Sequence, residues 1–201
     1  MGLDIEPKAL LGLHIARNIL FLNGLLRSDP EIMWSVPMKP DPIKTKAGEE
    51  SVWHYPRPPK LEPCNKRIRV VFADVTVADT TRTYRVLETS HPPVYYIPPS
   101  DVLMAYLNAD AGQSWCEWKG LGRYYGIRIG DRSKTQVAWY YPNPNDRFMA
   151  IKDHIAFYAG RVDACFVDEE QVTPQPGGFY GGWITKNIIG PFKGGPGTSG
   201  W

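Results

Sequence analysis

The chain has 201 residues, of which 43% are hydrophobic and 22% charged, and its formal net charge is +2 at pH 7. This length suits one well-buried domain with an extension, and this composition is typical of a soluble globular protein. The Lys and Arg residues are scattered, whereas a surface that binds nucleic acid or an anionic membrane needs a basic stripe, so we expect neither partner.

The chain has an odd number of cysteines and no Cys-x-x-Cys pair; the cysteines are Cys64, Cys116 and Cys165. This spacing argues against a disulfide framework and against a four-cysteine zinc site. We expect no metal and no cofactor. Reduced thiols are typical of cytosolic proteins, so the sequence also predicts a cytoplasmic location.

Residues 1–49 are predicted to form an amphipathic helix followed by a Pro-rich extension. The apolar segment 9–22 is interrupted by Arg17 and preceded by the acidic residues Asp4 and Glu6, without a small-residue cleavage site. These features argue against a signal peptide and against a membrane span. The apolar residues of the segment recur near helical spacing, which favours a helix docked on the domain.

The body of the chain, residues 50–173, shows mostly the signals of β-structure. Short β-branched or alternating runs, bounded by turn-forming residues, predict about eight strands. The main predicted strands cover residues 67–72, 75–78, 83–87, 114–118, 122–129, 136–141, 155–158 and 162–167. Ala73 and Asp74 separate the first two strands, which should therefore form a hairpin.

A proline-rich ribbon, residues 84–101, carries acidic, histidine and tyrosine side chains. Each X-Pro step fixes φ and pushes the preceding residue toward extended backbone, so the ribbon should be rigid. Ser100 or Asp101 then precedes good helix formers and predicts the N-cap of a short helix over residues 102–107. We interpret the ribbon as one wall of a binding site.

Residues 174–201 form the third predicted part of the chain. They are rich in Gly and Pro but contain regularly spaced aromatic residues. A purely disordered tail has few aromatic side chains, so we expect this segment to pack on the domain through Tyr180, Trp183 and Phe192.

Several segments, taken in order, resemble one known family. They are residues 87–102, 116–120 with Tyr124 and Tyr125, 138–142, 156–158 and 161–163. Together they resemble the family catalogued as domain of unknown function four-two-seven, also labelled nucleotidyltransferase-like, over roughly residues 50–201. The N-terminal segment and the Gly-rich tail are similar to those of the longer, fungal-type members.

The resemblance implies a mainly β fold, namely a single compact β-tent-like domain of two antiparallel sheets with one or two short helices and the N-terminal helix. β-tent relatives often hold zinc with two cysteine pairs, which this chain lacks. Other β-tent domains bind small planar ligands in an aromatic cage. The nucleotidyltransferase label has no counterpart here, because the sequence contains neither a Gly-Ser followed by paired Asp residues nor a phosphate-cradling loop before a helix.

Within the ribbon, Glu88 and His91 are the candidates for acid–base chemistry. Glu88 follows an apolar strand, so it either contacts a ligand or forms a salt bridge. Its predicted partners for a salt bridge are Arg82, Arg85 and Lys119. Histidine ordinarily titrates near neutral pH, which would suit His91 to proton transfer, while a hydrogen bond to the backbone is an equal alternative.

A second focus is Cys116, which lies three residues before Lys119. A nearby cation lowers the pKa of a thiol and makes it nucleophilic. Lys119 could instead bind a carboxylate or phosphate group as a point charge. The structural alternative is a small buried cysteine beside a surface lysine.

The predicted ligand-binding residues are Tyr96, Asp101, Trp115, Trp139 and Tyr141. Tyr95 and Tyr96 are adjacent in extended backbone, so one should point into the core and the other toward the site. Asp101 has the alternative role of helix N-cap. Most Trp and Tyr side chains should lie in the core, with a few lining a cavity.

Three functions follow as alternatives. The first is a small-molecule-binding β domain with an aromatic and polar pocket, whose ligand the sequence does not identify. The second is a hydrolase or transferase in which Cys116 is the nucleophile or Glu88 the general base. His91 would then transfer protons and Lys119 would stabilise charge. The third is an interaction module that recruits a protein through the aromatic C-terminal segment; the oligomeric state is not determined by the sequence.

Overall fold

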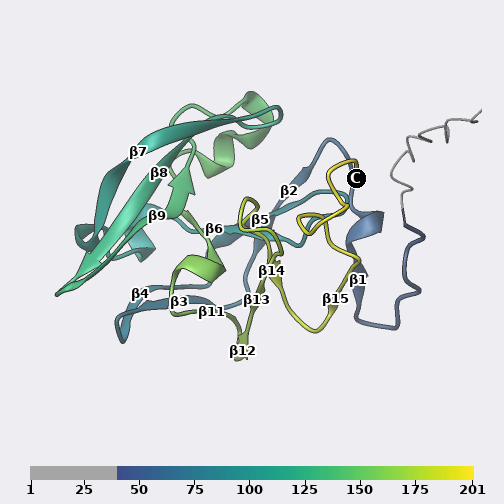
Figure 1. The fold of residues 1–201 in the computed structure, drawn as a ribbon, viewed down its shortest axis with the longest axis horizontal. Coiled ribbons are helices and arrows are strands. Elements are labelled where there is room, and N and C mark those ends of the chain that lie inside the picture. Colours follow the sequence, from purple (N-terminus) through teal and green to yellow (C-terminus); the bar gives the residue numbers. More distant parts are fainter. Residues whose placement is uncertain (1–39) are drawn as a thin grey trace, which may run out of the picture. The chain divides into compact units, whose positions relative to one another are not determined.

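The computed structural model describes residues 40–201, which lie within one compact unit spanning residues 35–201. This part is mainly β, as the sequence predicts, with fifteen strands and five short 3-10 helices (Figure 1). The predicted N-terminal amphipathic helix falls on residues outside the described range. Within that range, no helix has the length and hydropathy needed to cross a membrane.

Two four-stranded antiparallel sheets form most of the fold (Figure 1). The first has the order β10-β9-β8-β7, and its strands are β7 (Leu107–Cys116), β8 (Gly120–Ile129), β9 (Arg132–Tyr140) and β10 (Ala156–Phe157). The second has the order β12-β11-β3-β4, and its strands are β3 (Ile68–Phe72), β4 (Val75–Thr80), β11 (Ala164–Val167) and β12 (Glu170–Gln171). Short turns join several neighbouring strands directly, which antiparallel pairing allows.

Three smaller sheets complete the described part. The largest has the order β2-β5-β6, with β2 (Lys60–Cys64), β5 (Thr83–Leu87) and β6 (Val94–Tyr96). The others pair β13 (Thr173–Pro174) with β14 (Trp183–Ile184), and β1 (Glu50–Ser51) in parallel with β15 (Ile188–Ile189). The expectation of two sheets is therefore corrected to five. Prolines divide the strands because they cannot donate ladder hydrogen bonds, as at Pro92 and Pro93 before β6.

The predicted hairpin of β3 and β4 is confirmed. The two strands pair antiparallel, and Ala73 and Asp74 form the turn with φ values of 50° and 59°. Both residues adopt the left-handed backbone that a tight two-residue hairpin turn requires. Ile68, Val70 and Phe72 alternate with less buried neighbours and face the core.

The predicted short helix over residues 102–107 is confirmed only in part. The chain makes two single-turn 3-10 helices, η2 (Pro99–Asp101) and η3 (Met104–Tyr106). Val102 forms an isolated bridge with Ala78 of β4, and this pairing satisfies backbone groups that an α-helix would satisfy internally. The other 3-10 helices are η1 (Val52–His54), η4 (Asp146–Ile151) and η5 (Ala159–Arg161).

The core consists of three hydrophobic clusters. The first joins the two four-stranded sheets and includes Ile68 of β3 and Ile127 of β8, each at most 1% exposed. The second is rich in aromatic side chains and includes Tyr96 of β6 and Trp139 of β9. The third packs η1 against the C-terminal segment and includes Val52. Each cluster combines residues that are far apart in the sequence, so the sheets depend on one another for burial.

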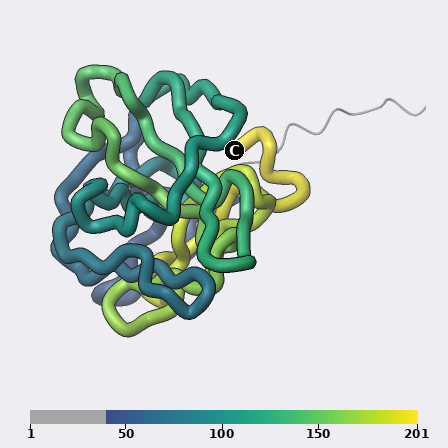
Figure 2. The backbone as a smooth tube through the Cα atoms, turned by 90° about the vertical axis from the view of Figure 1, so that its left-hand side faces the viewer, coloured from purple at the N-terminus to yellow at the C-terminus, as the bar shows by residue number. Residues whose placement is uncertain are grey.

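The C-terminal segment, residues 174–201, lies against the rest of the described chain in both views (Figures 1 and 2). Trp183 is 1% exposed, and its indole Nε1 donates a hydrogen bond of 2.9 Å to the carbonyl oxygen of Phe157. Trp201 packs edge-on against Trp53, with ring centroids 5.5 Å apart. The segment therefore supplies core side chains as well as the strands β14 and β15.

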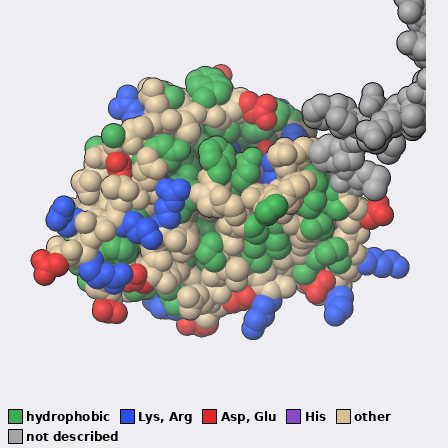
Figure 3. All heavy atoms as spheres, viewed as in Figure 1, with side chains coloured by type: hydrophobic (Ala, Val, Ile, Leu, Met, Phe, Trp, Pro, Cys, Tyr) green, Lys and Arg blue, Asp and Glu red, His purple; other side chains and the backbone are tan. Residues whose placement is uncertain are grey.

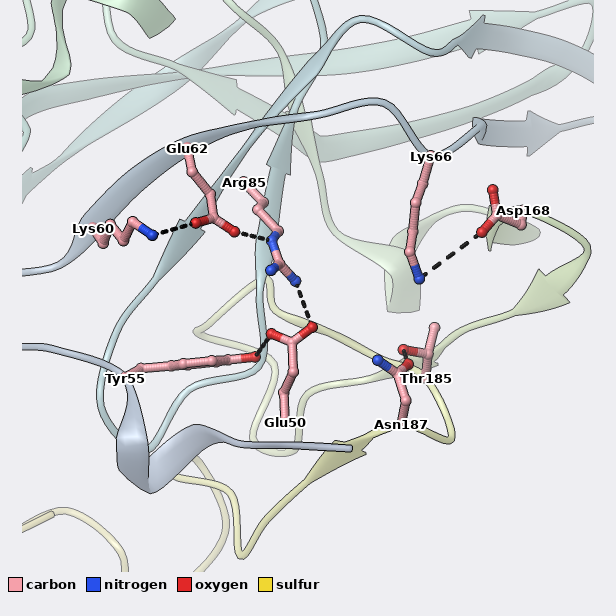
Figure 4. Close-up of polar contacts among 9 residues, drawn as sticks. All are labelled: Glu50, Tyr55, Lys60, Glu62, Lys66, Arg85, Asp168, Thr185 and Asn187. Atoms are coloured by element: carbon pink, nitrogen blue, oxygen red, sulfur yellow. Dashed lines mark hydrogen bonds and ion pairs between the residues drawn. The ribbon is translucent and has the colours of Figure 1, made fainter. Parts of the chain in front are cut away.

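A polar cluster around Arg85 fastens β1 to β2 and β5 (Figure 4). The guanidinium of Arg85 donates to Glu62 Oε1 at 2.6 Å and to Glu50 Oε1 at 3.0 Å. Lys60 pairs with the other carboxylate oxygen of Glu62 at 2.6 Å, and Tyr55 OH donates to Glu50 Oε2 at 2.9 Å. Two cations thus balance two carboxylates where these strands meet.

The surface drawn in Figure 3 mixes charges of both signs. Basic and acidic side chains both occur around the edge of this face, with hydrophobic groups between them. Exposed ion pairs within residues 40–201 join Arg67 to Asp79 at 2.6 Å and Arg132 to Asp163 at 2.7 Å. Such pairing reduces the net positive field of the basic residues.

Candidate functional site

A cavity of about 450 Å³ lies where β6, the β7–β8 turn, β9 and the C-terminal segment meet. Eight of the nine candidate site residues line it, namely Glu88, His91, Tyr96, Trp115, Cys116, Lys119, Trp139 and Tyr141. The ninth candidate, Asp101, is not part of the lining. The tertiary fold therefore brings together residues that the sequence places on separate strands and loops.

The β5–β6 ladder presents one of its faces to this cavity. Tyr96 pairs with Tyr84 and Val94 pairs with Val86, so these alternate residues share a face. Tyr95 lies on the opposite face and packs in the first core cluster at 3% exposure. The two adjacent tyrosines thus divide between the core and the cavity wall, as alternation along a strand predicts.

The wall of the cavity is largely aromatic. Trp139 packs against Tyr158 with ring centroids 4.4 Å apart and meets Tyr96 edge-on at 6.3 Å. The ring of Tyr141 lies 6.4 Å from that of Tyr96. Tilted and edge-on contacts of this kind suit the charge distribution of aromatic rings. Trp115 is 73% exposed and marks the open side of the cavity.

Close approach of the C-terminal segment forms another side of the cavity. A Cβ atom at Gly181 would lie 2.2 Å from Cη2 of Trp139, so only glycine permits this packing. Gln175, at 4% exposure, donates to the carbonyl oxygen of Lys193 at 2.8 Å and accepts from the backbone N–H of Gly182 at 3.1 Å. These bonds join separate parts of the C-terminal segment to one another beside the cavity.

Lys119 is buried at 7% exposure, which contradicts the alternative of a surface lysine. Its Nζ lies 5.4 Å from the ring centroid of Phe148 and 6.0 Å from that of Tyr141. No salt bridge joins Lys119 to an acidic side chain within residues 40–201. A buried cation in an aromatic wall therefore has no neutralising partner in the described protein.

The β7–β8 turn that carries Cys116, Trp118 and Lys119 is held by a neighbouring loop. Asn145 donates from Nδ2 to the carbonyl oxygen of Trp118 at 2.8 Å and from its backbone N–H to that of Lys119 at 3.2 Å. Gly120 follows with a φ of 93°, which side chains rarely tolerate. The direction of this turn is thus fixed by backbone contacts.

His91 is 7% exposed and held by the loop after β5. Its Nδ1 lies 2.9 Å from the carbonyl oxygen of Thr89, which only accepts, so Nδ1 carries the proton and Nε2 is left as an acceptor. Burial lowers the pKa of His91, and the side chain is therefore neutral at pH 7. The ring meets that of Tyr180 edge-on at 4.6 Å.

Glu88 forms an ion pair at the cavity with a residue outside its predicted partners. Arg57 Nη2 donates to Glu88 Oε1 at 3.0 Å. The predicted partners Arg82 and Arg85 pair with other carboxylates instead, and Lys119 forms no salt bridge within residues 40–201. The predicted salt bridge thus exists with a different cation, because the chain after η1 passes beside the end of β5.

Cys116 is partly buried in the cavity wall beside Tyr141. Burial raises the pKa of Tyr141, and the neighbouring Tyr96 and Cys116 raise it further. Burial also raises the pKa of Tyr96. Both phenols are therefore protonated at neutral pH and can contact a ligand through a hydroxyl group.

Asp101 lies in η2, away from the cavity lining, and the prediction that it caps a helix is wrong. The residue at the N-cap of η2 is Pro98. Asp101 Oδ2 accepts from Thr80 Oγ1 at 2.5 Å and from Arg82 Nε at 3.2 Å. Hydrogen bonds hold the pKa of Asp101 below its usual value, and those from Arg82 have a larger effect than the one from Thr80. This carboxylate ties η2 to the β4–β5 loop.

Several residues of the cavity were not among the candidates, notably Arg57, Trp118, Tyr124, Tyr158 and Lys193. Arg57 and Lys193 reach the cavity from opposite ends of the described chain, and no local pattern indicates such a meeting. The sequence does contain a signal for Trp118 as a cavity residue, because this aromatic residue directly precedes the candidate cation Lys119. Tyr158 lies just after β10, where only pairing with β9 brings it to the cavity.

The polar groups of the cavity do not resemble a metal centre. Within residues 40–201, no group of three or more His, Cys, Asp or Glu side chains is placed to hold a metal ion. The cavity instead combines aromatic faces with the neutral His91, the Arg57–Glu88 pair and the cationic Lys119. This arrangement can bind an organic molecule by stacking and a few directed polar contacts.

A family model described as a domain of unknown function (DUF427) matches residues 60–168. The match is narrower than the range 50–201 over which the sequence resembles that family, but it covers more than half of the chain and includes β2 to β11. No curated protein matches the chain significantly. The chain therefore belongs to the family described as domain of unknown function (DUF427).

Proposed function

We propose that the protein binds a small organic molecule in the aromatic cavity beside β6 and β9. The observation that carries this proposal is the convergence of eight candidate side chains on one cavity of about 450 Å³. Ligand sites in proteins typically measure about 300–1,000 Å³ and are lined by apolar and aromatic groups with a few polar ones. A β-tent-like fold of a longer, fungal-type member, as the resemblance implies, accords with a planar ligand.

The ligand would lie against aromatic faces and meet polar groups at the edges of the cavity. Trp139 and Tyr158 offer extended ring surfaces, and His91 Nε2 and Lys119 Nζ offer an acceptor and a donor. The proposal invokes a small molecule as the partner of a cytoplasmic protein, without a metal, cofactor, nucleic acid or membrane.

A thermal-shift screen of nucleobases, sugars and amino-acid derivatives tests the proposal. A ligand present at about one hundred times its Kd stabilises the native state by about 2.7 kcal/mol, which raises Tm by roughly 5–10 °C for a domain of this size. Trp115→Ala should weaken binding of such a compound without changing the Tm of the free protein, because Trp115 is 73% exposed. A screen without a stabilising compound, joined to a crystal structure with a closed cavity, would contradict the proposal.

A hydrolase or transferase is the second candidate, because Glu88, His91, Cys116 and Lys119 line the same cavity. Two contacts argue against the simplest roles, since Glu88 is paired with Arg57 and His91 directs Nδ1 to the backbone. The nucleophile version predicts that Cys116 reacts with iodoacetamide at pH 7 faster than free cysteine, and that Cys116→Ser removes this reaction. A rate no greater than that of free cysteine is the result that excludes it.

A further inference from the structure

Lys119 presents an ammonium group to the cavity without a protein anion to bind it. The residue is 7% exposed, and it forms no salt bridge within residues 40–201. Its contacts with the rings of Phe148 and Tyr141, at 5.4 and 6.0 Å, offset part of the cost of burial. Aromatic rings do not replace hydrogen-bond acceptors, and buried charges are stable when they are paired and hydrogen-bonded.

Other basic side chains of the cavity already have partners. Arg57 pairs with Glu88 at 3.0 Å. Lys193 donates from Nζ to the carbonyl oxygen of Trp201. Lys193 and Lys119 are both lysines and line the same cavity, so they differ in their partners and not in residue type. Lys119 is therefore the better placed of these cations to accept an outside partner.

Trp118 provides a second unsatisfied donor in the same turn. It lines the cavity, and its indole Nε1 is buried without a hydrogen-bond acceptor in the described part of the chain. Asn145 holds the backbone of Trp118 and Lys119 in place. Two neighbouring side chains that can only donate favour a group that only accepts, and carboxylate and phosphate oxygens are such acceptors.

We infer that the ligand is an aromatic or heteroaromatic molecule that carries an oxyanion, and that Lys119 binds this oxyanion while the ring lies against the aromatic wall. The inference rests on the proposed function, because it defines the ligand of the same cavity. Carboxylate and phosphate share the chemistry that Lys119 recognises. Which of the two is bound is an outcome of the experiment below.

The remaining charges of the cavity are compatible with a bound anion. Glu88 is neutralised by Arg57. Glu117, the other carboxylate in the lining, is exposed, so water and salt screen its charge. His91 carries its proton on Nδ1, which faces the carbonyl oxygen of Thr89. A ligand anion thus meets one unpaired buried cation and no unpaired buried carboxylate among the described lining residues.

Three probes with one ring system test the inference with the 201-residue chain, namely 2-naphthoate, 2-naphthyl phosphate and the neutral 2-naphthamide. Isothermal titration calorimetry measures their Kd values. We expect at least one anion to bind about tenfold to one hundredfold more tightly than the amide, the range for a hydrogen bond to a charged group. The tighter anion identifies the preferred oxyanion.

Substitutions of Lys119 assign the preference to this residue. Lys119→Met keeps the length of the side chain and removes its charge, so it should abolish the preference for anions and leave the Kd of the amide within about twofold. Lys119→Arg should restore part of the preference. Lys193→Met is the matched control, because Lys193 lines the same cavity but is bonded to Trp201; the preference should survive in this variant.

The ligand-free proteins provide a second readout that does not depend on the probes. Removal of an unpaired buried cation should leave the Tm of Lys119→Met equal to or above that of the wild type, since apolar groups of similar volume often replace buried charges without loss of stability. A lower Tm for Lys119→Met than for the wild type would indicate that Lys119 supports the fold and would count against an anion site.

The possible results separate the two proposals. Equal Kd values of the three probes for the wild type would overturn the inference and leave small-molecule binding intact. A preference for anions that persists in Lys119→Met would overturn the role of Lys119. If none of the naphthyl compounds binds, the inference is overturned as well, and the broader compound screen decides the proposed function separately.

Discussion

At the scale of single residues, burial and local hydrogen bonds give different roles to polar side chains that the sequence predicts as members of one site. His91 and Lys119 are both polar, both 7% exposed and both part of the cavity lining. The carbonyl oxygen of Thr89 satisfies His91 Nδ1, whereas Lys119 forms no salt bridge within the described residues. The first is therefore a fixed neutral group of the wall, and the second is the candidate for a charged contact.

The titration of His91 leads to a prediction on stability. Burial lowers the pKa of His91 below its ordinary value of 6.5 in the folded protein. Below pH 6.5 the unfolded chain binds more protons at this residue, so stability that is complete above pH 6.5 is lost as the pH falls toward the folded-state pKa. We expect Tm to decrease from about pH 7 to about pH 5 and His91→Gln to reduce this decrease, as measured by thermal unfolding at successive pH values.

A control at another histidine makes this test specific. His54 is exposed, so His54→Gln should keep the pH dependence of the wild type. The groups that act on His91, namely Glu88, Arg57 and Lys193 by charge and Tyr180 by ring contact, are present in both variants. An unchanged pH dependence in His91→Gln is the result that the prediction does not allow.

At the scale of elements, the charged cluster around Arg85 joins strands that are distant in the sequence (Figure 4). The side chain of Arg85 is 19% exposed and lies between Glu50 and Glu62. Arg85→Met leaves two partly buried carboxylates without this partner, so we expect a loss of about 2–3 kcal/mol in the free energy of unfolding. Urea denaturation measures this loss.

Lys66→Met is the matched control for the Arg85 variant. Lys66 lies 3.9 Å from Asp168, and the two side chains are 44% and 56% exposed (Figure 4). An exposed pair contributes little, so we expect a change of at most about 0.5 kcal/mol.

The Arg85 variant should also show a pH dependence that arises from Glu62. Burial acts to raise the pKa of Glu62, but hydrogen bonds from Lys60 and Arg85 outweigh it and lower this pKa below 4.5. The difference between the wild type and Arg85→Met should therefore shrink as the pH falls below that value.

The C-terminal segment provides a prediction that separates structure from recruitment. Trp183 is 1% exposed, bonds to the Phe157 carbonyl and packs on Tyr95 at 5.3 Å. Trp183→Ala should therefore destabilise the fold by about 3–5 kcal/mol. Phe179, in the same segment, is 68% exposed, and Phe179→Ala should change stability by at most about 0.5 kcal/mol. Chemical denaturation of both variants makes the comparison.

Similar effects of the two substitutions would contradict a structural role of this segment. Loss of a protein partner in Phe179→Ala, with unfolding unchanged, would instead favour the function of an interaction module. The distinction matters because Phe179 and Gly181 also line the cavity. A role in ligand binding would appear as a higher Kd of a small molecule rather than as lost association.

Local sequence patterns predict some element boundaries correctly and others not. The β3–β4 hairpin follows from local alternation and a two-residue turn, and it is confirmed. Residues 102–107 have good helix propensity, but Val102 pairs with Ala78 and Leu107 begins β7. Tertiary pairing overrides intrinsic propensity in such a short segment, because the nucleation of an isolated helical turn is unfavourable.

At the scale of the whole molecule, the packed core should make thiol reactivity a measure of global unfolding. Cys165 is 1% exposed in the first core cluster, and burial raises its pKa, so its thiol is shielded and protonated. Cys64 and Cys116 are only partly buried. With an aromatic disulfide reagent at neutral pH, we expect these two to react in the folded protein and Cys165 to react only as the molecule unfolds.

Cys165→Ala should remove the slow reaction and leave the faster ones unchanged. Low concentrations of urea should accelerate the slow reaction in parallel with the equilibrium between folded and unfolded protein. Reaction of all three thiols at one rate in the native protein would show that the cluster around Cys165 opens locally, contrary to the prediction.

The sequence by itself determined the mainly β character, the β3–β4 hairpin and the family of the chain. It also indicated most of the aromatic and polar side chains that line the cavity, including Tyr96 and Trp139. These features depend on alternation, turn residues and short motifs, all of which act over a few neighbouring positions.

Only the tertiary structure decided which of these side chains meet and what each of them contacts. Glu88 pairs with Arg57 rather than with a predicted partner, Asp101 lies outside the cavity, and Lys119 is buried without an acidic partner in the described chain. Gly181 completes the wall from the C-terminal segment. Such contacts join segments tens of residues apart, and their geometry depends on packing across several sheets, which no local pattern specifies.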